Sequence, residues 1–284
     1  MQVTALKNDA GSIGLVALDE AYLLADSIGL SIKEPSHEEL LNDVLSELLN
    51  LFRQQASGLV LDPVYSLPLL KEDEQNAPLI VRLEQLQNPD PLAVPQLLKN
   101  WGVEDISNMY GMAKLELHYH PAEEQALTKK QFVAEIFDFC EHEEIDLLLK
   151  LMIYNPTEEK FDIPKFQESQ MEAVSELQRF ASILALQYPQ DPLAAATLTT
   201  NLDIPWLLTA DDTPYDRFKE NLRVALENGA TGFLASETLW QEIEGMRHSD
   251  QSPDIEKILQ FIQTTSKDRI IELLRISKEE LADQ

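Results

Sequence analysis

Eight short apolar segments recur along this chain, and their spacing limits the fold more than any other feature. Most are rich in branched aliphatic residues and are separated by helical patterns, which is typical of parallel strands joined by crossover helices. Eight such units in 284 residues predict an α/β fold consisting of a single (β/α)8 TIM barrel. The predicted strands are Ile13–Leu18, Gly58–Leu61, Leu79–Leu83, Met112–His118, Ile145–Met152, Ser182–Pro189, Ile204–Thr209 and Thr231–Ala235.

Several helices between these strands have recognisable starts. Ser36–Glu39 and Thr128–Gln131 both have the residue pattern of a capping box, in which two side chains cover the first free N–H groups of a helix. Further helices are predicted from about Pro91 to Trp101 and from about Pro164 to Phe180. The helix after the second capping box is expected to bury four side chains at helical spacing. These are Phe132, Ile136, Phe139 and Cys140.

The end of the chain has a helical pattern without further strands. Ile255–Thr264 and Lys267–Leu274 are predicted as two helices. We therefore divide the chain into a barrel over residues 1–245 and a helical C-terminal extension, residues 246–284, that packs on the barrel.

The charge balance excludes several classes of partner. The chain has 22 basic and 50 acidic residues, a net charge of −28, which repels nucleic acid and anionic membranes. A single cysteine, no long apolar run and no secretory leader pattern predict a soluble cytoplasmic protein. The acidity has two interpretations: a solvated surface, or a surface that docks onto a basic protein partner.

Polar residues on the fourth and fifth strands are the main candidates for chemistry, because barrel active sites lie at the C-terminal ends of the strands. Alternation places Lys114, Glu116 and His118 inside the barrel, and Lys150 is the one charge within the apolar run Leu147–Met152. The lysines have two interpretations. They form a structural ion-pair network with Asp19, Asp62 and Glu116, or one of them is a Schiff-base lysine with carboxylates as proton shuttles. The candidate catalytic residues are Lys150, Lys114, Asp19 and Asp62. The candidate substrate-binding residues are Arg82, Glu116, Gln187 and Asp211.

Metal and cofactor sites have weak signals in this sequence. His118 and His120 form an H-x-H pair, but no third ligand stands at a recognisable spacing, so we predict no metal. The nine glycines form neither a dinucleotide-binding fingerprint nor a phosphate loop, and we predict no cofactor.

Four stretches resemble a known family. Leu15–Asp19 and Leu61–Pro68 look like the start of the tagatose 1,6-bisphosphate aldolase family of class I aldolases. Lys114–Leu127 is similar to the aldolase domain of 2-deoxy-5-keto-gluconate 6-phosphate aldolase, and Phe218–Trp240 matches the end of both. The resemblance covers roughly residues 13 to 243 and rests on the order and spacing of diverged motifs.

The resemblance implies a partly conserved active site. Asp19 and Lys114 match an aspartate and a lysine of the family. Lys150 stands where the family has a glutamate, and Ala185 stands where it has the Schiff-base lysine. Because alanine cannot form an imine, the family's covalent route is predicted to be lost.

The resemblance also implies a phosphate site that this chain lacks. The family has a glycine-containing loop after the seventh strand, where this chain has Thr209–Thr213 with two aspartates, Asp211 and Asp212. Glu237 replaces a phosphate-binding arginine before Trp240. These carboxylates would repel a phosphate group.

Three functions remain open from the sequence. The first is a diverged aldolase-like barrel that binds a ligand or regulates a partner without the inherited activity. The second is a class I lyase acting on an oxo-sugar or a related carbonyl compound through a relocated lysine, Lys150, because every strand end of a barrel points to one cavity. The third is a metal enzyme using His118 and His120, which we rank last. The family resemblance also implies a homodimer.

Overall fold

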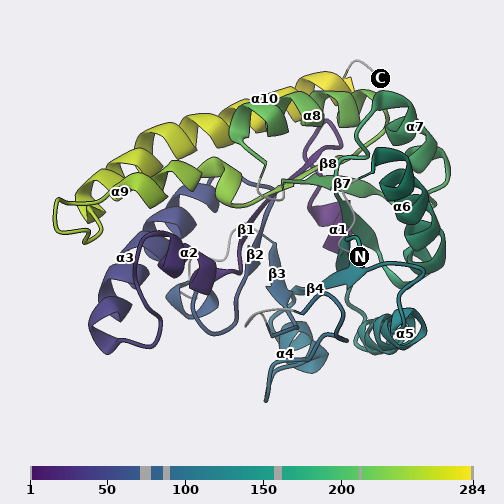
Figure 1. The fold of residues 1–284 in the computed structure, drawn as a ribbon, viewed down its shortest axis with the longest axis horizontal. Helices are drawn as coiled ribbons and strands as arrows, with labels where there is room; N and C mark the ends of the chain where they lie inside the picture. The colour runs from purple at the N-terminus through teal and green to yellow at the C-terminus, as the bar shows by residue number, and fades with distance from the viewer. Residues whose placement is uncertain (1, 71–77, 86–89, 157–161, 211–212, 283–284) are drawn as a thin grey trace.

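The computed structural model describes residues 2–70, 78–85, 90–156, 162–210 and 213–282. Eight parallel strands pair in sequence order, and β8 pairs with β1 to close the barrel (Figure 1). This confirms the predicted TIM barrel. The strands are β1 (Ile13–Leu18), β2 (Gly58–Leu61), β3 (Leu79–Arg82), β4 (Met112–Tyr119), β5 (Leu147–Ile153), β6 (Ile183–Leu186), β7 (Trp206–Thr209) and β8 (Gly232–Ala235).

Helices surround the barrel as an outer ring in Figure 1. None of the helices in the described ranges is long and apolar enough to cross a membrane. The α-helices are α1 (Gln2–Ala5), α2 (Ala21–Ser27), α3 (Pro35–Phe52), α4 (Val103–Asn108), α5 (Ala126–His142), α6 (Ile163–Leu177), α7 (Pro192–Thr200), α8 (Tyr215–Glu227), α9 (Ile255–Phe261) and α10 (Lys267–Ala282).

The N-terminal half of the barrel interior is filled by apolar side chains. The N-terminal segment covers this end, where the Val3 N–H donates to Asp146 Oδ2 and the Asp146 N–H donates to Gln2 Oε1. The interior apolar cluster contains Leu6, Ile13, Leu15, Val60, Ile80, Met112, Leu148, Ile183, Ala185, Leu207 and Leu234.

Strand β4 has the alternation that the sequence predicts. Ala113, Leu115 and Leu117 belong to the larger core between the strands and the helices. Lys114 and Glu116 point the other way and meet inside the barrel. The period-two pattern of the strand therefore determines which side chains reach the interior.

Both predicted capping boxes are wrong. Helix α3 begins at Pro35, one residue before Ser36, because proline has the backbone angle that the first helical position requires. Helix α5 begins at Ala126, two residues before Thr128. Neither predicted capping residue lies at the start of its helix.

The predicted helix from Pro91 to Trp101 is also wrong. This stretch is irregular, and Leu97 forms an isolated antiparallel bridge with Glu84. A proline at position 95, in the middle of the segment, would remove a helical hydrogen bond and clash with the preceding turn. The helix in this region is the short α4, beyond the predicted end.

The buried face of α5 differs from the predicted one at Phe139 and at the residues of the first two turns. Ile136 and Cys140 are buried and Phe132 is half-buried, but Phe139 is 61% exposed. Successive helical residues are rotated by about 100°, so Phe139 lies beside the stripe that ends at Cys140. Lys129, not a hydrophobic residue, occupies the first turn of that stripe.

The C-terminal segment takes a place in the helical ring. Helix α9, the π-helical turn η6 (Ile262–Ser266) and α10 follow one another without a break. They pack against α3, α8 and β1, and α10 runs beside α8 in Figure 1. Helix α10 continues to Ala282, beyond Leu274, where the predicted helix ended.

Candidate functional site

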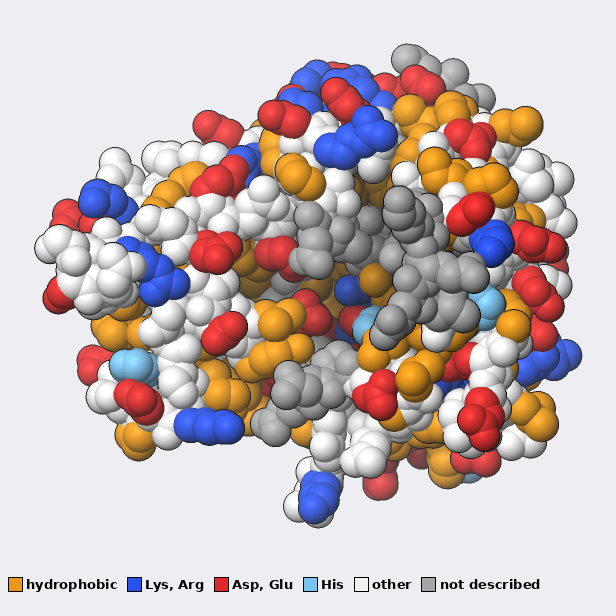
Figure 2. All heavy atoms as spheres, viewed as in Figure 1, with side chains coloured by type: hydrophobic (Ala, Val, Ile, Leu, Met, Phe, Trp, Pro, Cys, Tyr) orange, Lys and Arg blue, Asp and Glu red, His pale blue; other side chains and the backbone are white. Residues whose placement is uncertain are grey.

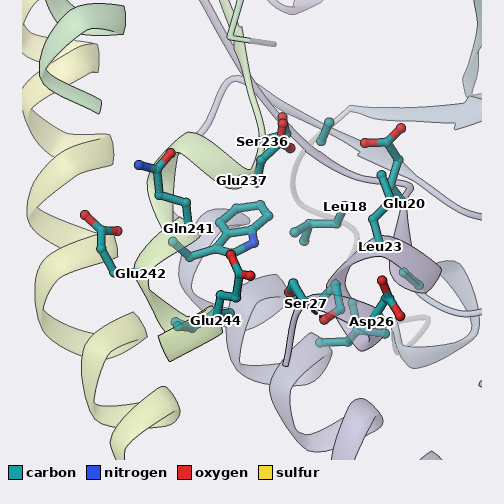
Figure 3. Close-up of a pocket in the computed structure, with 16 residues that line it drawn as sticks. Leu18, Glu20, Leu23, Asp26, Ser27, Ser236, Glu237, Gln241, Glu242 and Glu244 are labelled. Atoms are coloured by element: carbon teal, nitrogen blue, oxygen red, sulfur yellow. Dashed lines mark hydrogen bonds between the residues drawn. The ribbon is translucent and has the colours of Figure 1, made fainter. Parts of the chain in front are cut away.

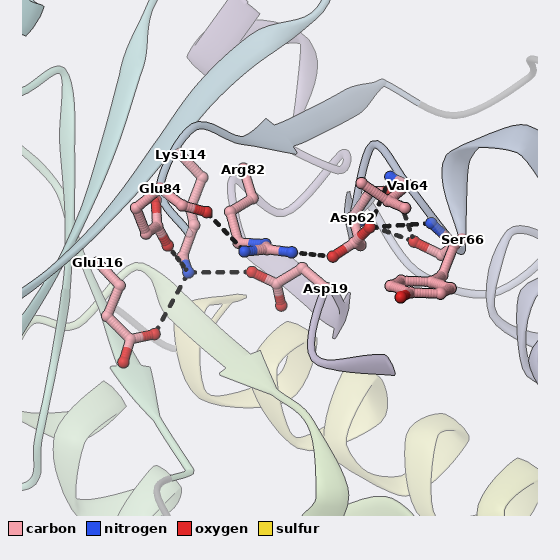
Figure 4. A network of polar contacts seen from close by, with 9 residues as sticks. Asp19, Asp62, Val64, Ser66, Arg82, Glu84, Lys114 and Glu116 are labelled. Atoms are coloured by element: carbon pink, nitrogen blue, oxygen red, sulfur yellow. Dashed lines mark hydrogen bonds and ion pairs between the residues drawn. The ribbon is translucent and has the colours of Figure 1, made fainter. Parts of the chain in front are cut away.

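Charged side chains gather inside the C-terminal half of the barrel. Figure 2 shows a hollow at the centre of this face, with acidic, basic and histidine side chains lying within it. Figure 4 shows how the buried members converge from β1, β2, β3 and β4. The strand ends therefore position one continuous polar network in an otherwise apolar barrel.

Lys114 is the centre of this network. Its Nζ lies 2.9 Å from Asp19 Oδ2, 2.8 Å from Glu84 Oε1 and 3.2 Å from Glu116 Oε2. Burial on its own would lower the pKa of Lys114, but the three carboxylates together raise it above the ordinary value of a lysine. Lys114 is therefore a fixed cation, unsuited to attack a carbonyl group.

Lys150 shares a carboxylate with Lys114. Its Nζ lies 3.2 Å from the same oxygen, Glu116 Oε2, and its side chain is 14% exposed. Burial alone would raise the pKa of Glu116, but the two lysines outweigh it and hold that pKa below its usual range. In the sheet register Lys150 stands beside Ala185 of β6. A lysine thus lies one strand away from the alanine, at the same height in the barrel.

Arg82 joins the strand ends on the other side of the interior. Its guanidinium forms a buried ion pair with Asp62 and donates from Nη1 to the Glu84 carbonyl at 2.5 Å (Figure 4). Asp62 Oδ1 also accepts from the backbone N–H groups of Val64 and Tyr65, at 2.6 and 2.9 Å. Asp62 therefore pairs with the arginine, whereas the predicted network had assigned it to the lysines.

Glu84 belongs to the network but is missing from the predicted site. It lies two residues after Arg82, just beyond β3, and is 2% exposed. Burial raises the pKa of Glu84, although Lys114 and Arg82 oppose the rise. Period-two alternation continued from Arg82 would have identified it, but the predicted strand ended at Leu83.

Glu20 is a second acidic residue that the sequence did not single out. It directly follows Asp19 at the end of β1. Burial raises the pKa of Glu20 to about 8, with Lys150 opposing the rise and Glu116 reinforcing it. At neutral pH Glu20 is therefore mostly protonated and uncharged.

The titration of Glu20 predicts a pH-dependent stability. The pKa is 4.5 in the unfolded chain and about 8 in the folded protein, so the folded state holds the proton more tightly. The free energy of unfolding should then fall as pH rises from 4.5 to 8, by at most about 1.4 kcal/mol per pH unit. Glu20→Gln should flatten this fall in urea denaturation between pH 5.5 and 8.5. The exposed Glu220→Gln should leave the slope unchanged, and parallel curves for wild type and Glu20→Gln would contradict the assignment.

The two histidines of the H-x-H pair contact different groups. His118 Nε2 is 3.6 Å from Glu116 Oε1, and burial lowers the pKa of its imidazole. The ring nitrogens of His120 contact the Ala122 N–H and Ser169 Oγ, each at 3.1 Å. Within the described ranges no group of three histidine, cysteine or carboxylate side chains could hold a metal ion.

A second buried lysine, Lys129, holds the loop after β4 in place. Lys129 Nζ contacts Glu123 Oε2 at 2.7 Å, the His118 carbonyl at 2.9 Å and the Pro91 carbonyl at 2.6 Å. The Tyr154 hydroxyl donates to the same Glu123 carboxylate. All these partners belong to the protein, which indicates a structural clamp.

Of the two remaining predicted substrate-binding residues, Gln187 and Asp211, the structure describes only Gln187. Gln187 lies just beyond β6, and its Oε1 accepts from the Ile153 N–H at 2.7 Å, which ties the ends of β5 and β6 together. Asp211 lies outside the described residues, as does Asp212. The network thus unites Asp19, Asp62, Arg82, Lys114, Glu116 and Lys150 of the predicted site.

A pocket of about 560 Å³ lies beside this network, between α2 and the two 3-10 turns after β8 (Figure 3). These turns are η4 (Glu237–Leu239) and η5 (Gln241–Gly245). Glu20 lines the pocket as well as facing the network. The pocket includes Glu237, which stands where the family resemblance implies a phosphate-binding arginine.

Comparisons with known proteins agree with this architecture. No family model matches the chain. The chain is 23% identical over 270 residues to tagatose 1,6-diphosphate aldolase 2 of Enterococcus faecalis, covering 83% of this chain and 81% of that protein.

Solved structures show the same fold at low sequence identity. The fructose-bisphosphate aldolase of Plasmodium falciparum, in complex with TRAP and an inhibitor, matches with a TM-score of 0.67 at 12% identity, over 99% of this chain and 92% of that one. An archaeal fructose-1,6-bisphosphate aldolase with its catalytic Lys bound to a carbinolamine intermediate matches with a TM-score of 0.65 at 14% identity, over 91% and 98%. These findings confirm the resemblance to class I aldolases.

Proposed function

We propose that this protein is a ligand-binding barrel of aldolase ancestry that holds its ligand without forming an imine. The observation that carries the proposal is the state of the lysines in the barrel interior. Lys114 is locked between three carboxylates, and Lys150 is paired with the ionised Glu116. An amine must lose its proton before it attacks a carbonyl group, and neighbouring carboxylates oppose that loss.

The environment of Ala185 supports the same proposal. Its methyl group is fully buried, and its register neighbours are Lys150 on β5 and Leu207 on β7. It belongs to the apolar interior cluster, so this position contributes packing and no reactive group. The acidic pocket between α2 and the turns after β8 disfavours the phosphorylated substrate named for the aldolase relative.

One observation favours a second candidate, a class I lyase. The register places Lys150 beside Ala185, so a relocated amine would approach the same cavity from the adjacent strand. In that reaction the Lys150 nitrogen would add to the carbonyl carbon and water would leave, giving an imine. The Lys150 ammonium group, 14% exposed, would first lose its proton to solvent, because Glu116 is held ionised with a lowered pKa and is a poor proton acceptor.

Borohydride trapping separates the two functions. The protein is incubated with dihydroxyacetone, dihydroxyacetone phosphate, pyruvate and a panel of oxo-sugars, reduced with borohydride and analysed by intact mass spectrometry. We expect no adduct, because Lys114 is a buried cation among three carboxylates and Lys150 is ion-paired with Glu116. A class I aldolase treated in parallel shows that the conditions trap an imine.

The variants locate any adduct that does form. An adduct that is present in wild type and in Lys165→Ala, but absent in Lys150→Ala, would overturn the binding proposal and establish the lyase. Lys165 lies on α6, outside the barrel network, and controls for reaction at ordinary surface lysines. Adducts of equal yield in all three proteins would mark surface chemistry and leave the proposal standing.

A further inference from the structure

The charged residues that line the pocket between α2 and the turns η4 and η5 are all acidic. Of its sixteen described lining residues, five are acidic and none is basic. Figure 3 shows the carboxylates on both sides of the pocket, on α2 and on the segment after β8. Glu242 is paired with Arg269, which reduces its contribution. The acidic members are Glu20, Asp26, Glu237, Glu242 and Glu244.

The walls of the same pocket are apolar. Leu18, Leu24 and Trp240 line it and are buried, and the Trp240 ring lies 5.7 Å from that of Phe52. A volume of about 560 Å³ falls in the range of small-molecule sites, which is roughly 300 to 1,000 Å³. The cavity therefore offers an apolar surface together with negative charge.

The surroundings of Glu20 independently indicate a site for a polar ligand group. Protein atoms surround its carboxyl group on nearly every side, although the residue keeps some accessible surface in the pocket. Among the described residues its carboxyl group forms no hydrogen bond and no ion pair, and the nearby charged groups are Lys150, Glu116, Asp19 and Lys114. A buried carboxyl group without a partner is unfavourable, and a cationic donor in the pocket would satisfy it.

We propose that this pocket binds an aliphatic amine, with the ammonium group between Glu20 and Glu237 and the hydrocarbon chain against Leu18, Leu24 and Trp240. An ammonium group donates three hydrogen bonds, which suits carboxylates that approach from two sides. Trp240 can also attract the cation through its ring face. The inference names the ligand class for the proposed binding function and rests on that function.

The probes are n-butylamine, n-butanol and butyrate, measured by isothermal titration calorimetry at pH 7.5. They share a four-carbon chain and differ in charge. We expect saturable one-to-one binding of the amine alone. Equal affinity for the amine and the alcohol would overturn the proposal, because the carboxylates would then contribute nothing.

Two pairs of variants locate the site. Leu23→Lys places a cation at the pocket edge on a residue that is already 46% exposed, and it should weaken amine binding by about tenfold. Leu193→Lys makes the same change on α7, at a residue 77% exposed and outside this pocket, and should have little effect. Glu237→Gln should weaken binding by about tenfold, whereas Glu220→Gln on α8 should not.

The pH dependence tests the role of Glu20. A bound ammonium group favours the ionised carboxylate, so binding should release a proton and should strengthen as pH rises from 6.5 to 8.5. Glu20→Gln should abolish this dependence. Binding that responds equally to both lysine variants, or a pH profile unchanged in Glu20→Gln, would identify diffuse attraction to an acidic surface and refute the site.

The test is independent of the trapping experiment. A primary amine carries no carbonyl group, so it cannot form an imine with Lys150. An adduct in the trapping experiment would overturn the proposed non-covalent function while leaving the calorimetric result in force. The absence of amine binding would refute this pocket assignment and leave the trapping result unaffected.

Discussion

Gly232→Ala is expected to destabilise the barrel by more than about 4 kcal/mol, or to prevent it from folding. A β-carbon at this position would lie 1.8 Å from the Ile13 carbonyl oxygen and 2.7 Å from its carbonyl carbon. Gly232 and Ile13 are register partners in the β8–β1 pair that closes the barrel. Both clashing atoms are backbone, so no side-chain rotation can relieve the overlap. Urea denaturation followed by circular dichroism measures the loss.

Gly245→Ala provides the matched control. A β-carbon at Gly245, at the end of η5, would have no heavy atom within 4 Å. We expect its effect to stay within about 0.5 kcal/mol, as for most exposed substitutions. If the two variants were equally stable, the close approach of β8 to β1 would not be essential for closure.

Lys114→Met is expected to lower the free energy of unfolding by about 3–5 kcal/mol. The substitution keeps most of the side-chain volume but leaves Asp19, Glu84 and Glu116 without their shared cation. The loss should be measured by urea denaturation at pH 7.5. It should be smaller at pH 5.5, because protonation of the carboxylates removes part of their repulsion.

Two further variants test the cause of this loss. Lys219→Met, on α8, removes a lysine that is 26% exposed and should cost less than about 1 kcal/mol. Lys114→Met combined with Glu84→Gln should recover part of the stability, because one of the uncompensated carboxylates is then neutral. Additive losses in the double variant would show that the lysine stabilises by packing rather than by charge.

The strand alternation made much of the site predictable. Counting by two along β4 correctly places Lys114 and Glu116 inside the barrel, and the spacing of strands and helices correctly predicts the order around it. The same counting stopped too early at β3 and therefore missed Glu84. Glu20 could not be found this way, because it lies beyond the strand and its environment is created by β4 and β5.

Local helix signals were less reliable than strand patterns. The capping-box pattern at Ser36 does not start a helix, because α3 already begins at the preceding Pro35. The pattern at Thr128 lies inside a helix that begins at Ala126. Both patterns contain common polar residues, so they occur by chance at helix interiors as well as at starts. Lys129, part of the second pattern, is completely buried because carbonyl groups from other segments reach its ammonium group.

The sequence by itself determined the barrel and the inward-facing side chains of β4, because periodicity and strand spacing are properties of neighbouring residues. Only the tertiary structure decided the ionic partners. It pairs Asp62 with Arg82, gathers three carboxylates around Lys114 and sets Lys150 beside Ala185. Those contacts join residues on different strands, and their charges depend on burial and on distances that exist only after the barrel has closed.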